Sequence, residues 1–290
     1  MKDARLRENR RHGTAEFPLA VYRMEQGEGE PILDFHWHEE TEFLWVESGR
    51  AAFQVGMRAY ELEAGEGVFV PPGALHGGVS LNGSPCTYMA VVFDLMWLTH
   101  PQDGLSARYL LPLQRGQAEL PAVFARRDRL GRTVLRRLAR ICRLAGSADP
   151  ARDFAVKAEL YAIFAAYAAG GSWSRPGPAG AADARALERL KNVLSYIERH
   201  YAEKLTIRQL AAEAGLSAGH FSRLFKTYMR RTPIEYVIRC RIREAARLLA
   251  ETGWPVGEVA GAVGFDHFGY FSRRFREVYQ CSPSEYRKRI

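Results

Sequence analysis

Residues 207–217 read IRQLAAEAGLS, and residues 256–266 read VGEVAGAVGFD, the same pattern 49 positions later. The match continues at an offset of 50: FSRLFK at 221–226 returns as FSRRFR at 271–276, and PIEY at 233–236 returns as PSEY at 283–286. Seven of the sixteen positions from Phe221 to Tyr236 are identical in the second copy. A self-match at this period indicates one supersecondary unit present twice.

Each copy predicts a helix, a tight turn and a second helix. Gly215 and Gly264 fall where the first helix must end in a left-handed residue, a conformation that glycine adopts without steric cost. Ser217 and Asp266 follow two residues later, where a short polar side chain can cap the second helix. The pattern is that of a helix-turn-helix, whose second helix enters the major groove of DNA.

The remaining face of the second helix carries polar and cationic side chains in both copies. Arginine can bond both acceptors of a guanine edge, so Arg223 and Arg273 are the predicted base readers. The alternative is that they are solvated charges on a protein-binding module, but two copies with localised positive charge favour DNA. The predicted DNA-binding residues are Ser217, His220, Ser222, Arg223 and Lys226, then Tyr270, Ser272, Arg273 and Arg276; phosphate contacts are expected from Lys226, Arg230, Arg231, Arg274 and Arg276.

Apolar residues at helical spacing between 234 and 249 predict one continuous helix joining the two copies. Such a rigid helix is expected to hold the recognition helices about 34 Å apart, so that one chain reads consecutive major grooves. Residues 187–290 hold 19 Lys and Arg against 11 Asp and Glu, whereas residues 1–186 hold 22 of each. The net charge of +8 therefore lies in the last third of the chain, which favours a polyanion as partner.

The last hundred residues resemble the DNA-binding domain of the AraC/XylS family. The resemblance is carried by GFDHFGYFSRRFR at 264–276, by Ser282-Pro283 and by Tyr286-Arg287. It implies sequence-specific transcriptional regulation, more often activation, by contact with RNA polymerase.

Two features depart from that family pattern. Arg230 and Gln280 stand where glycine commonly follows each recognition helix, so the helix endings are expected to differ. Gly219 and the pair Phe268-Gly269 stand near the starts of the recognition helices, where small polar residues are more usual in the second copy. These positions bear on base readout.

The first half of the chain predicts a different architecture. Short alternating apolar runs, punctuated by Gly and Pro between residues 17 and 95, are typical of a small β-barrel or sandwich. Apolar residues at helical spacing between 128 and 168 predict two amphipathic helices. Such helices bury their apolar stripes either on the barrel or on a partner subunit.

Three histidines and a glutamate in the barrel segment are spaced to share one site. Because residues two and four apart share a face of a strand, His36, His38 and Glu42 are predicted to point into the barrel, where His76 can join them. Three imidazoles and a carboxylate suit a divalent first-row metal, with Zn, Ni, Mn and Fe as candidates. The spacing resembles both motifs of the cupin barrel, which AraC/XylS regulators usually carry, with Ser80 in place of the usual Asn.

The same four residues also fit the lining of an organic effector pocket, or a purely structural role. The aromatic residues of these strands are expected to be mostly core, with a pocket wall as the alternative. They are Trp37, Trp45, Phe53, Phe69 and Tyr88.

Together these patterns predict an α+β two-domain chain. Its N-terminal part is a cupin-like β-barrel with appended helices, and its C-terminal part is an all-α double helix-turn-helix domain. The expected segments are a flexible basic arm at 1–16, the sensor barrel at 17–100, a helical extension and candidate dimerisation surface at 101–170, a linker at 171–186 and the DNA-binding domain at 187–290.

The predicted function is sequence-specific regulation of transcription, more often activation, controlled by a small-molecule effector or a metal in the barrel. The expected partners are double-stranded DNA, RNA polymerase, the effector and a second copy of the chain, with no membrane. Neither an apolar leader nor a membrane-length apolar run occurs, so the cytoplasm is the expected location. The four cysteines lack C-x-x-C spacing and are expected to be reduced thiols. The alternative class is a metal-dependent cupin enzyme tethered to DNA; no catalytic residue is assigned.

Overall fold

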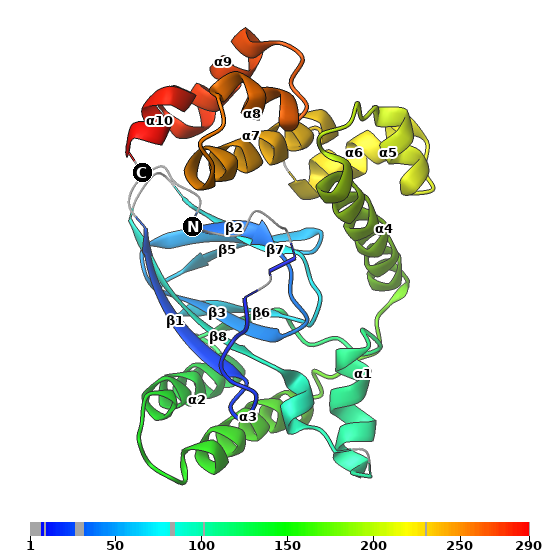
Figure 1. Cartoon of the computed structure of the whole chain (residues 1–290). Helices are drawn as coiled ribbons and strands as arrows, with labels where there is room; N and C mark the ends of the chain where they lie inside the picture. Colours follow the sequence, from blue (N-terminus) through cyan, green and yellow to red (C-terminus); the bar gives the residue numbers. More distant parts are fainter. Residues whose placement is uncertain are drawn as a thin grey trace. The chain divides into compact units, whose positions relative to one another are not determined.

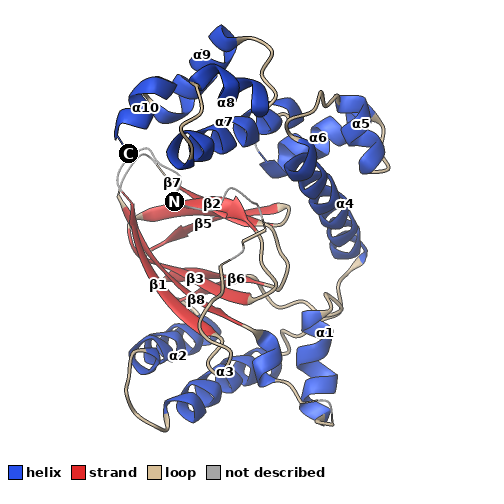
Figure 2. Ribbon diagram, in the orientation of Figure 1, coloured by secondary structure: helices blue, strands red, loops and turns tan. Residues whose placement is uncertain are grey.

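A computed structural model describes residues 7–8, 10–26, 32–81, 85–100, 102–229 and 231–289. The chain divides into two compact units, Arg7–Ala184 and the part from Arg185 onward. The first unit holds all the strands in the described residues and the second is helical, as the sequence predicts (Figure 2).

Two antiparallel sheets face each other in the N-terminal unit. The five-stranded sheet has the order β1-β8-β3-β6-β9, and the four-stranded sheet has the order β2-β7-β4-β5. Strands that are adjacent in the chain therefore often lie in different sheets. The chain crosses from one sheet to the other after β2, for example. The strands are β1 (Leu19–Gln26), β2 (Leu33–His36), β3 (Thr41–Ser48), β4 (Arg50–Val55), β5 (Arg58–Glu63), β6 (Glu66–Val70), β7 (His76–Ser80), β8 (Cys86–Phe93) and β9 (Val123–Ala125).

The alternation of β3 separates two hydrophobic cores. Leu44 and Val46 point between the sheets, where they pack with Phe53 and Tyr88. Trp45, which lies between them in the chain, points to the outer face of the five-stranded sheet. The aromatic side chains of this region are mostly core, as expected, but Trp45 and Phe69 belong to the outer core and not to the barrel interior.

Helices α2 (Arg129–Ala145) and α3 (Arg152–Ala169) cover the outer face of the five-stranded sheet (Figure 1). Their stripes, which include the fully buried Leu138 and Ile163, pack against the sheet. A Cβ at Gly131 would lie 2.0 Å from the carbonyl oxygen of Ala125, so α2 begins in direct contact with β9. Packing on the barrel therefore accounts for the buried stripes of both helices without a second subunit.

The segment between the barrel and α2 belongs to the barrel. It contains a short 3-10 helix (Leu95–Leu98), a π-helical turn (Ser106–Leu110), α1 (Leu111–Gln114) and strand β9, which pairs with β6. The predicted boundary at residue 100 therefore divides elements that share one core. The predicted stripe of α3, Phe154, Ala158, Tyr161 and Phe164, is largely wrong: Phe154 (82% exposed) and Ala158 are exposed, and only Phe164 is buried. The buried apolar face is instead Val156, Leu160, Ile163 and Tyr167, because this apolar helix offers more than one face at helical spacing.

The N-terminal segment differs from the predicted flexible arm over its described part. Arg7 forms an isolated bridge with Trp37, and the Glu8 N–H donates to the Trp37 carbonyl at 2.9 Å. His12 is only 4% exposed and Phe17 is buried. Contacts with side chains far along the chain hold this segment, and such contacts leave no local signal in the sequence. Residues 1–6 and Asn9 of the predicted arm lie outside the described residues.

The C-terminal unit consists of helices around two small aromatic cores. Helix α4, which leads into this unit, begins at Pro178, inside the predicted linker 171–186 and ahead of the unit's start at Arg185. Within the described residues no helix is both long and apolar enough to cross a bilayer. The helices are α4 (Pro178–His200), α5 (Ile207–Glu213), α6 (Ala218–Met229), α7 (Pro233–Glu251), α8 (Val256–Ala262), α9 (Phe268–Tyr279) and α10 (Pro283–Arg289).

Candidate DNA-binding surface and metal site

The two repeats fold as two helix-turn-helix units, α5 with α6 and α8 with α9. Gly215 and Gly264 end the first helix of each unit with positive φ, 62° and 88°, as the turn requires. Ser217 caps α6, because its Oγ lies 3.4 Å from the His220 amide nitrogen. The predicted cap by Asp266 is wrong: α9 starts at Phe268 after an N-cap residue that makes no side-chain capping bond.

The first recognition helix, α6, buries one aromatic face and exposes the predicted DNA-binding face. Phe221 and Phe225 are fully buried. Ser222 is half-buried, whereas Ser217, His220, Arg223 and Lys226 are exposed. Arg231 is exposed beyond the helix, and Arg230 lies outside the described residues. This face can reach a groove, because its cations and hydrogen-bonding groups are on the side away from the core.

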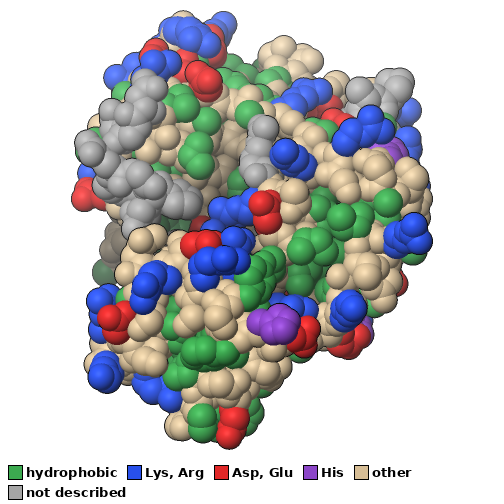
Figure 3. All heavy atoms as spheres, turned by 90° about the horizontal axis from the view of Figure 1, so that it is seen from above, with side chains coloured by type: hydrophobic (Ala, Val, Ile, Leu, Met, Phe, Trp, Pro, Cys, Tyr) green, Lys and Arg blue, Asp and Glu red, His purple; other side chains and the backbone are tan. Residues whose placement is uncertain are grey.

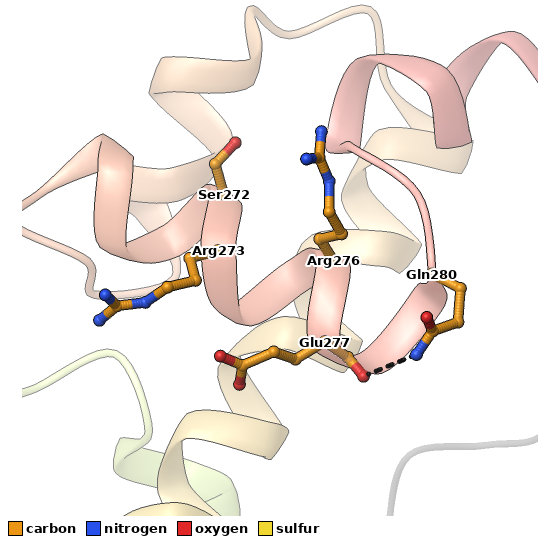
Figure 4. A pocket seen from close by; sticks show the side chains of 5 residues that line it. All are labelled: Ser272, Arg273, Arg276, Glu277 and Gln280. Atoms are coloured by element: carbon orange, nitrogen blue, oxygen red, sulfur yellow. Dashed lines mark hydrogen bonds between the residues drawn. The ribbon is translucent and has the colours of Figure 1, made fainter.

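An open hollow lies beside the second recognition helix, α9. It is lined by Ser272, Arg273, Arg276, Glu277 and Gln280 (Figure 4). Arg273 lies over the Tyr270 ring at 5.4 Å. That contact orients the guanidinium at the surface, where it can bond a base edge.

Arg274 differs from the other predicted phosphate ligands on α9. It is half-buried and pairs with Glu277 at 2.6 Å. Arg276 is exposed and lines the hollow. Among the predicted phosphate ligands of α9, Arg276 is therefore the better placed, because the charge of Arg274 is already offset within the helix.

The predicted joining helix is present as α7, which is continuous for 19 residues, or about 28 Å at 1.5 Å per residue. It begins with a capping box in which Thr232 and Glu235 satisfy each other's backbone amides. The Arg241 side chain donates to the carbonyls of Tyr201 and Gly264, at 2.7 Å from Nε and 2.5 Å from Nη1. The end of α4, the joining helix and the turn of the second unit are thus tied together.

Two exposed aromatic side chains add to the predicted surface. Phe268 at the start of α9 is 52% exposed, and Trp254, just before α8, is 46% exposed. The sequence marks Phe268 only as a departure from the family pattern, because apolar residues are otherwise read as core. Lys and Arg side chains are spread over one face of the molecule, with acidic groups beside some of them (Figure 3). Because acidic and basic side chains are mixed, net charge alone does not identify the DNA contacts, which depend on the individual residues of α6 and α9.

The second cluster of functional side chains lies at one end of the barrel, between the sheets. His36 ends β2 and is the register partner of His76 at the start of β7. His38 lies in the crossover, and Glu42 extends from β3. The ligand atoms of all four lie within 4.8 Å of one another. The prediction that His36, His38 and Glu42 share one strand is wrong, because the chain changes sheets between them, yet the crossover brings the three together.

The hydrogen bonds of these histidines fix which ring nitrogen faces the cluster. Nδ1 of His36 bonds the Asp34 carbonyl at 2.8 Å, and Nδ1 of His76 bonds the Ala74 carbonyl at 2.9 Å. His38 Nδ1 lies 3.2 Å from the carbonyl of Glu40. A carbonyl only accepts, so in each ring Nδ1 is the donor to the backbone and Nε2 is the nitrogen that faces the cluster.

The Glu42 carboxylate stands among these nitrogens, and its Oε2 is buried without a hydrogen-bond partner among the described residues. Its Oε2 lies 2.8 Å from His76 Nε2 and 3.4 Å from His38 Nε2. Burial, followed by repulsion from His36, lowers the pKa of His76 to about 4, so its ring is neutral at neutral pH. Burial would raise the pKa of Glu42, but the surrounding histidines lower it below the ordinary value, so it is a carboxylate. Lone pairs and an anion converge, an arrangement that a cation stabilises.

Sequence reasoning missed two further donors, Glu8 and His12. Together with His38 they form a second group whose ligand atoms also lie within 4.8 Å of one another. They come from the N-terminal segment, which carries no strand pattern and reads as a basic tail. The only local signal is the spacing of Glu8 and His12, four residues apart.

Comparisons with known proteins match both parts of this geometry. A family profile described as Helix-turn-helix domain matches residues 210–289, and one described as Cupin domain matches residues 20–92. The chain is 27% identical over 288 residues to the uncharacterized HTH-type transcriptional regulator YdeC of Bacillus subtilis (strain 168), covering 99% of this chain and 97% of that protein. It is 40% identical over 106 residues to the probable transcriptional regulator LumQ of Photobacterium leiognathi, covering 36% of this chain and 43% of that protein. The solved DNA-binding domain of AdpA, in complex with a target DNA, is similar at 32% identity and a TM-score of 0.34, covering 35% of this chain and 91% of that chain.

The fold and these matches define a transcriptional regulator with an AraC-type DNA-binding domain and a cupin domain. These are the two domains that the resemblance to the AraC/XylS family predicts, and both are confirmed. The α+β fold class predicted from the sequence is confirmed as well.

Proposed function

We propose that this regulator reads a specific operator in double-stranded DNA through α6 and α9, and that a divalent metal ion in the barrel controls it. Arg223 and Arg273 read base edges in this proposal, and Lys226, Arg231 and Arg276 bind phosphates. The exposed faces of the two recognition helices support the assignment, as does their attachment to one rigid helix, α7.

The observation that carries the metal proposal is that Nε2 of His38 and Nε2 of His76 converge on the Glu42 carboxylate, with a ligand atom of His36 in the same group. A set of imidazoles with one carboxylate suits Zn, Ni, Mn or Fe. His36, His38, Glu42 and His76 would hold the ion, and each ring is already oriented by a backbone carbonyl. When bound, the ion supplies the positive charge that these four donors lack. The donors come from both sheets, so metal binding would tie the sheets together.

A small-molecule effector is the second candidate ligand of the same site. An ion that prefers six ligands and has four from the protein keeps positions for an external oxygen or nitrogen donor. The effector would then bind beside the ion, and its differential affinity for two arrangements of the chain would shift DNA binding.

The proposal includes activation through RNA polymerase, a homodimer and a cytoplasmic location. The HTH-type transcriptional activator Btr of Bacillus subtilis (strain 168), 38% identical over 88 residues, supports activation. Phe154 on α3, with 82% of its surface exposed, is the residue of the helical extension at which we test the homodimer. Native mass spectrometry of Phe154→Ser against the parent chain measures its effect on the dimer.

DNA recognition is tested with the double variant Arg223→Ala, Arg273→Ala. Each lost bidentate contact should weaken operator binding by about 1–3 kcal/mol, with little effect on non-specific DNA. Arg189→Ala, an exposed arginine on α4, is the matched control. Unchanged operator affinity and footprint in the double variant would contradict the assignment of base readers.

The metal is tested by native mass spectrometry of the protein as purified and after reloading with Zn, Ni, Mn or Fe. One ion per chain is expected, and His38→Ala should lose it, whereas His100→Ala, an exposed histidine outside the cluster, should keep it. A chain that takes up no ion at stoichiometric concentration contradicts the metal proposal. Operator affinity that is equal with and without the bound ion contradicts metal control.

A further inference from the structure

The N-terminal segment contributes its own donors to the barrel site. Glu8 Oε2 lies 3.2 Å from His36 Nε2 and 3.4 Å from His12 Nε2. His12 and His38 have ring centroids 5.2 Å apart, so the two groups of donors share His38. The donors of the segment therefore reach the nitrogens that the barrel site presents.

His12 is held in position by a hydrogen bond and by burial. Its Nδ1 lies 3.0 Å from the Tyr22 hydroxyl, which leaves Nε2 facing Glu8. That Nε2 is buried without a hydrogen-bond partner among the described residues, and the whole residue is only 4% exposed. Its neighbours Arg10 and Arg11 are exposed. A buried imidazole whose second nitrogen makes no hydrogen bond and faces the Glu8 carboxylate, on a segment otherwise at the surface, points to a bound cation.

The ends of the segment are attached differently. Phe17 is buried against Trp97, with ring centroids 5.3 Å apart, and this contact uses no metal donor. Ahead of it, residues 7–12 are attached through Trp37, Tyr22 and the two donors. Loss of the cation would therefore release residues 7–12 and leave the chain from Phe17 onward in place.

We propose that Glu8 and His12 are additional metal ligands, and that a bound ion clamps residues 7–12 to the barrel. This inference rests on the metal site proposed above and extends it to a metal-dependent latch. The competing account is a protonated histidine paired with Glu8. The two accounts differ in whether the segment responds to metal at constant pH.

Linkage gives the latch a quantitative signature. If the ion binds more tightly when residues 7–12 are closed, then closure must be favoured by the same factor when the ion binds. The factor by which metal shifts the equilibrium of the segment toward its closed form should therefore equal the factor by which opening weakens metal binding, and removal of Glu8 and His12 mimics the open form. Loss of one or two ligands is expected to weaken metal binding by at least the roughly ten- to hundredfold that loss of an outer-shell partner costs.

The experiment uses the full chain, stripped of metal and titrated with Co²⁺, whose visible absorption reports its ligands. Trypsin cleavage after Arg10 and Arg11 reports opening of residues 7–12, with Co²⁺ and with chelator. The variants are Glu8→Gln alone and Glu8→Gln with His12→Gln; Glu16→Gln, an exposed glutamate of the same segment, is the matched control. The parent chain and the Glu16→Gln control should bind one Co²⁺ and be cleaved at least tenfold more slowly with it.

Each outcome decides between the proposals. If the Glu8 variants bind Co²⁺ more weakly, with an altered spectrum and no protection from trypsin, the latch is supported. If they bind Co²⁺ with the parent's affinity and spectrum, and Co²⁺ protects them as it protects the parent, the latch is wrong and the four-donor site stands. If the parent chain binds no Co²⁺, the metal site itself is wrong and the latch with it. Glu8→Gln alone guards against misfolding, because Glu8 is partly exposed.

Discussion

Replacing Gly264 by alanine should damage the second helix-turn-helix unit far more than the equivalent change at Gly215 damages the first. Both glycines have positive φ, 88° and 62°, so both variants place an L-residue in the left-handed region at about 1–2 kcal/mol. The surroundings differ: a Cβ at Gly264 would lie 2.3 Å from the Ala202 carbonyl oxygen, whereas nothing lies within 4 Å of one at Gly215.

The clash at Gly264 cannot be relieved by a side-chain rotation, because its partner is backbone. The backbone around Ala202 is held by Arg241, which donates to the carbonyls of Tyr201 and Glu203 at 2.7 and 2.8 Å. The Gly264 carbonyl is bonded by the same guanidinium. Overpacking against such a fixed neighbour costs about 1–3 kcal/mol, and a lost hydrogen bond to the charged group costs about 1.5–3 kcal/mol more.

We therefore expect the free energy of unfolding to fall by about 1–2 kcal/mol in Gly215→Ala. In Gly264→Ala it should fall by about 2–5 kcal/mol from strain and overpacking, and by about 1.5–3 kcal/mol more from the lost hydrogen bond. Hydrogen exchange of the full chain in increasing urea measures each unit separately, through peptides covering α5–α6 and α8–α9. Peptides from residues 201–203 should lose protection only in Gly264→Ala. Equal losses in the two variants, or no change around Ala202, would refute the packing argument.

Three further predictions concern a helix end, a helix start and the barrel. Gln280→Gly should raise the free energy of unfolding of the C-terminal unit by about 0.5–1 kcal/mol, because Gln280 has φ 54° and is the one non-glycine residue with positive φ among those described; a lower melting temperature would contradict this. The Thr232 backbone amide and hydroxyl lower the pKa of Glu235, so its contribution is present above the ordinary pKa of 4.5 and is lost as pH falls through the lower folded-state value. Glu235→Gln keeps the capping geometry. In melts between pH 7 and 3 its melting temperature should fall less steeply at acid pH than that of the parent chain; an equally steep fall would show that other carboxylates cause it. Removing the metal with a chelator should lower the free energy of unfolding of the barrel unit by about 2.7 kcal/mol, compared with metal present at a hundred times its dissociation constant. The His38→Ala variant should have the same melting temperature with and without chelator. A parent chain whose melting temperature does not change with chelator would count against the metal site.

The helix-turn-helix half of the protein was almost fully predictable, because its signals are local. Positive φ at Gly215 and Gly264 follows from where glycine falls in the repeat, and burial of Phe221 and Phe271 follows from helical spacing. The prediction of a cap at Asp266 was wrong, because a cap depends on the residue at which the helix begins, and α9 begins at Phe268. It also could not predict that Arg274 is paired with Glu277, because several acidic partners lie within reach on a helix surface.

The barrel site divides in the same way. Sequence by itself determined the family, the double helix-turn-helix, the location of the positive charge and the four donors His36, His38, Glu42 and His76, because residue type and short-range spacing encode all of these. Only the tertiary structure decided that the donors come from two sheets, that α2 and α3 cover the outer face of the barrel, and that Glu8 and His12 join the cluster. Contacts between residues far apart in the chain depend on strand order and on how the chain crosses between sheets, and no periodicity of a single segment carries that information.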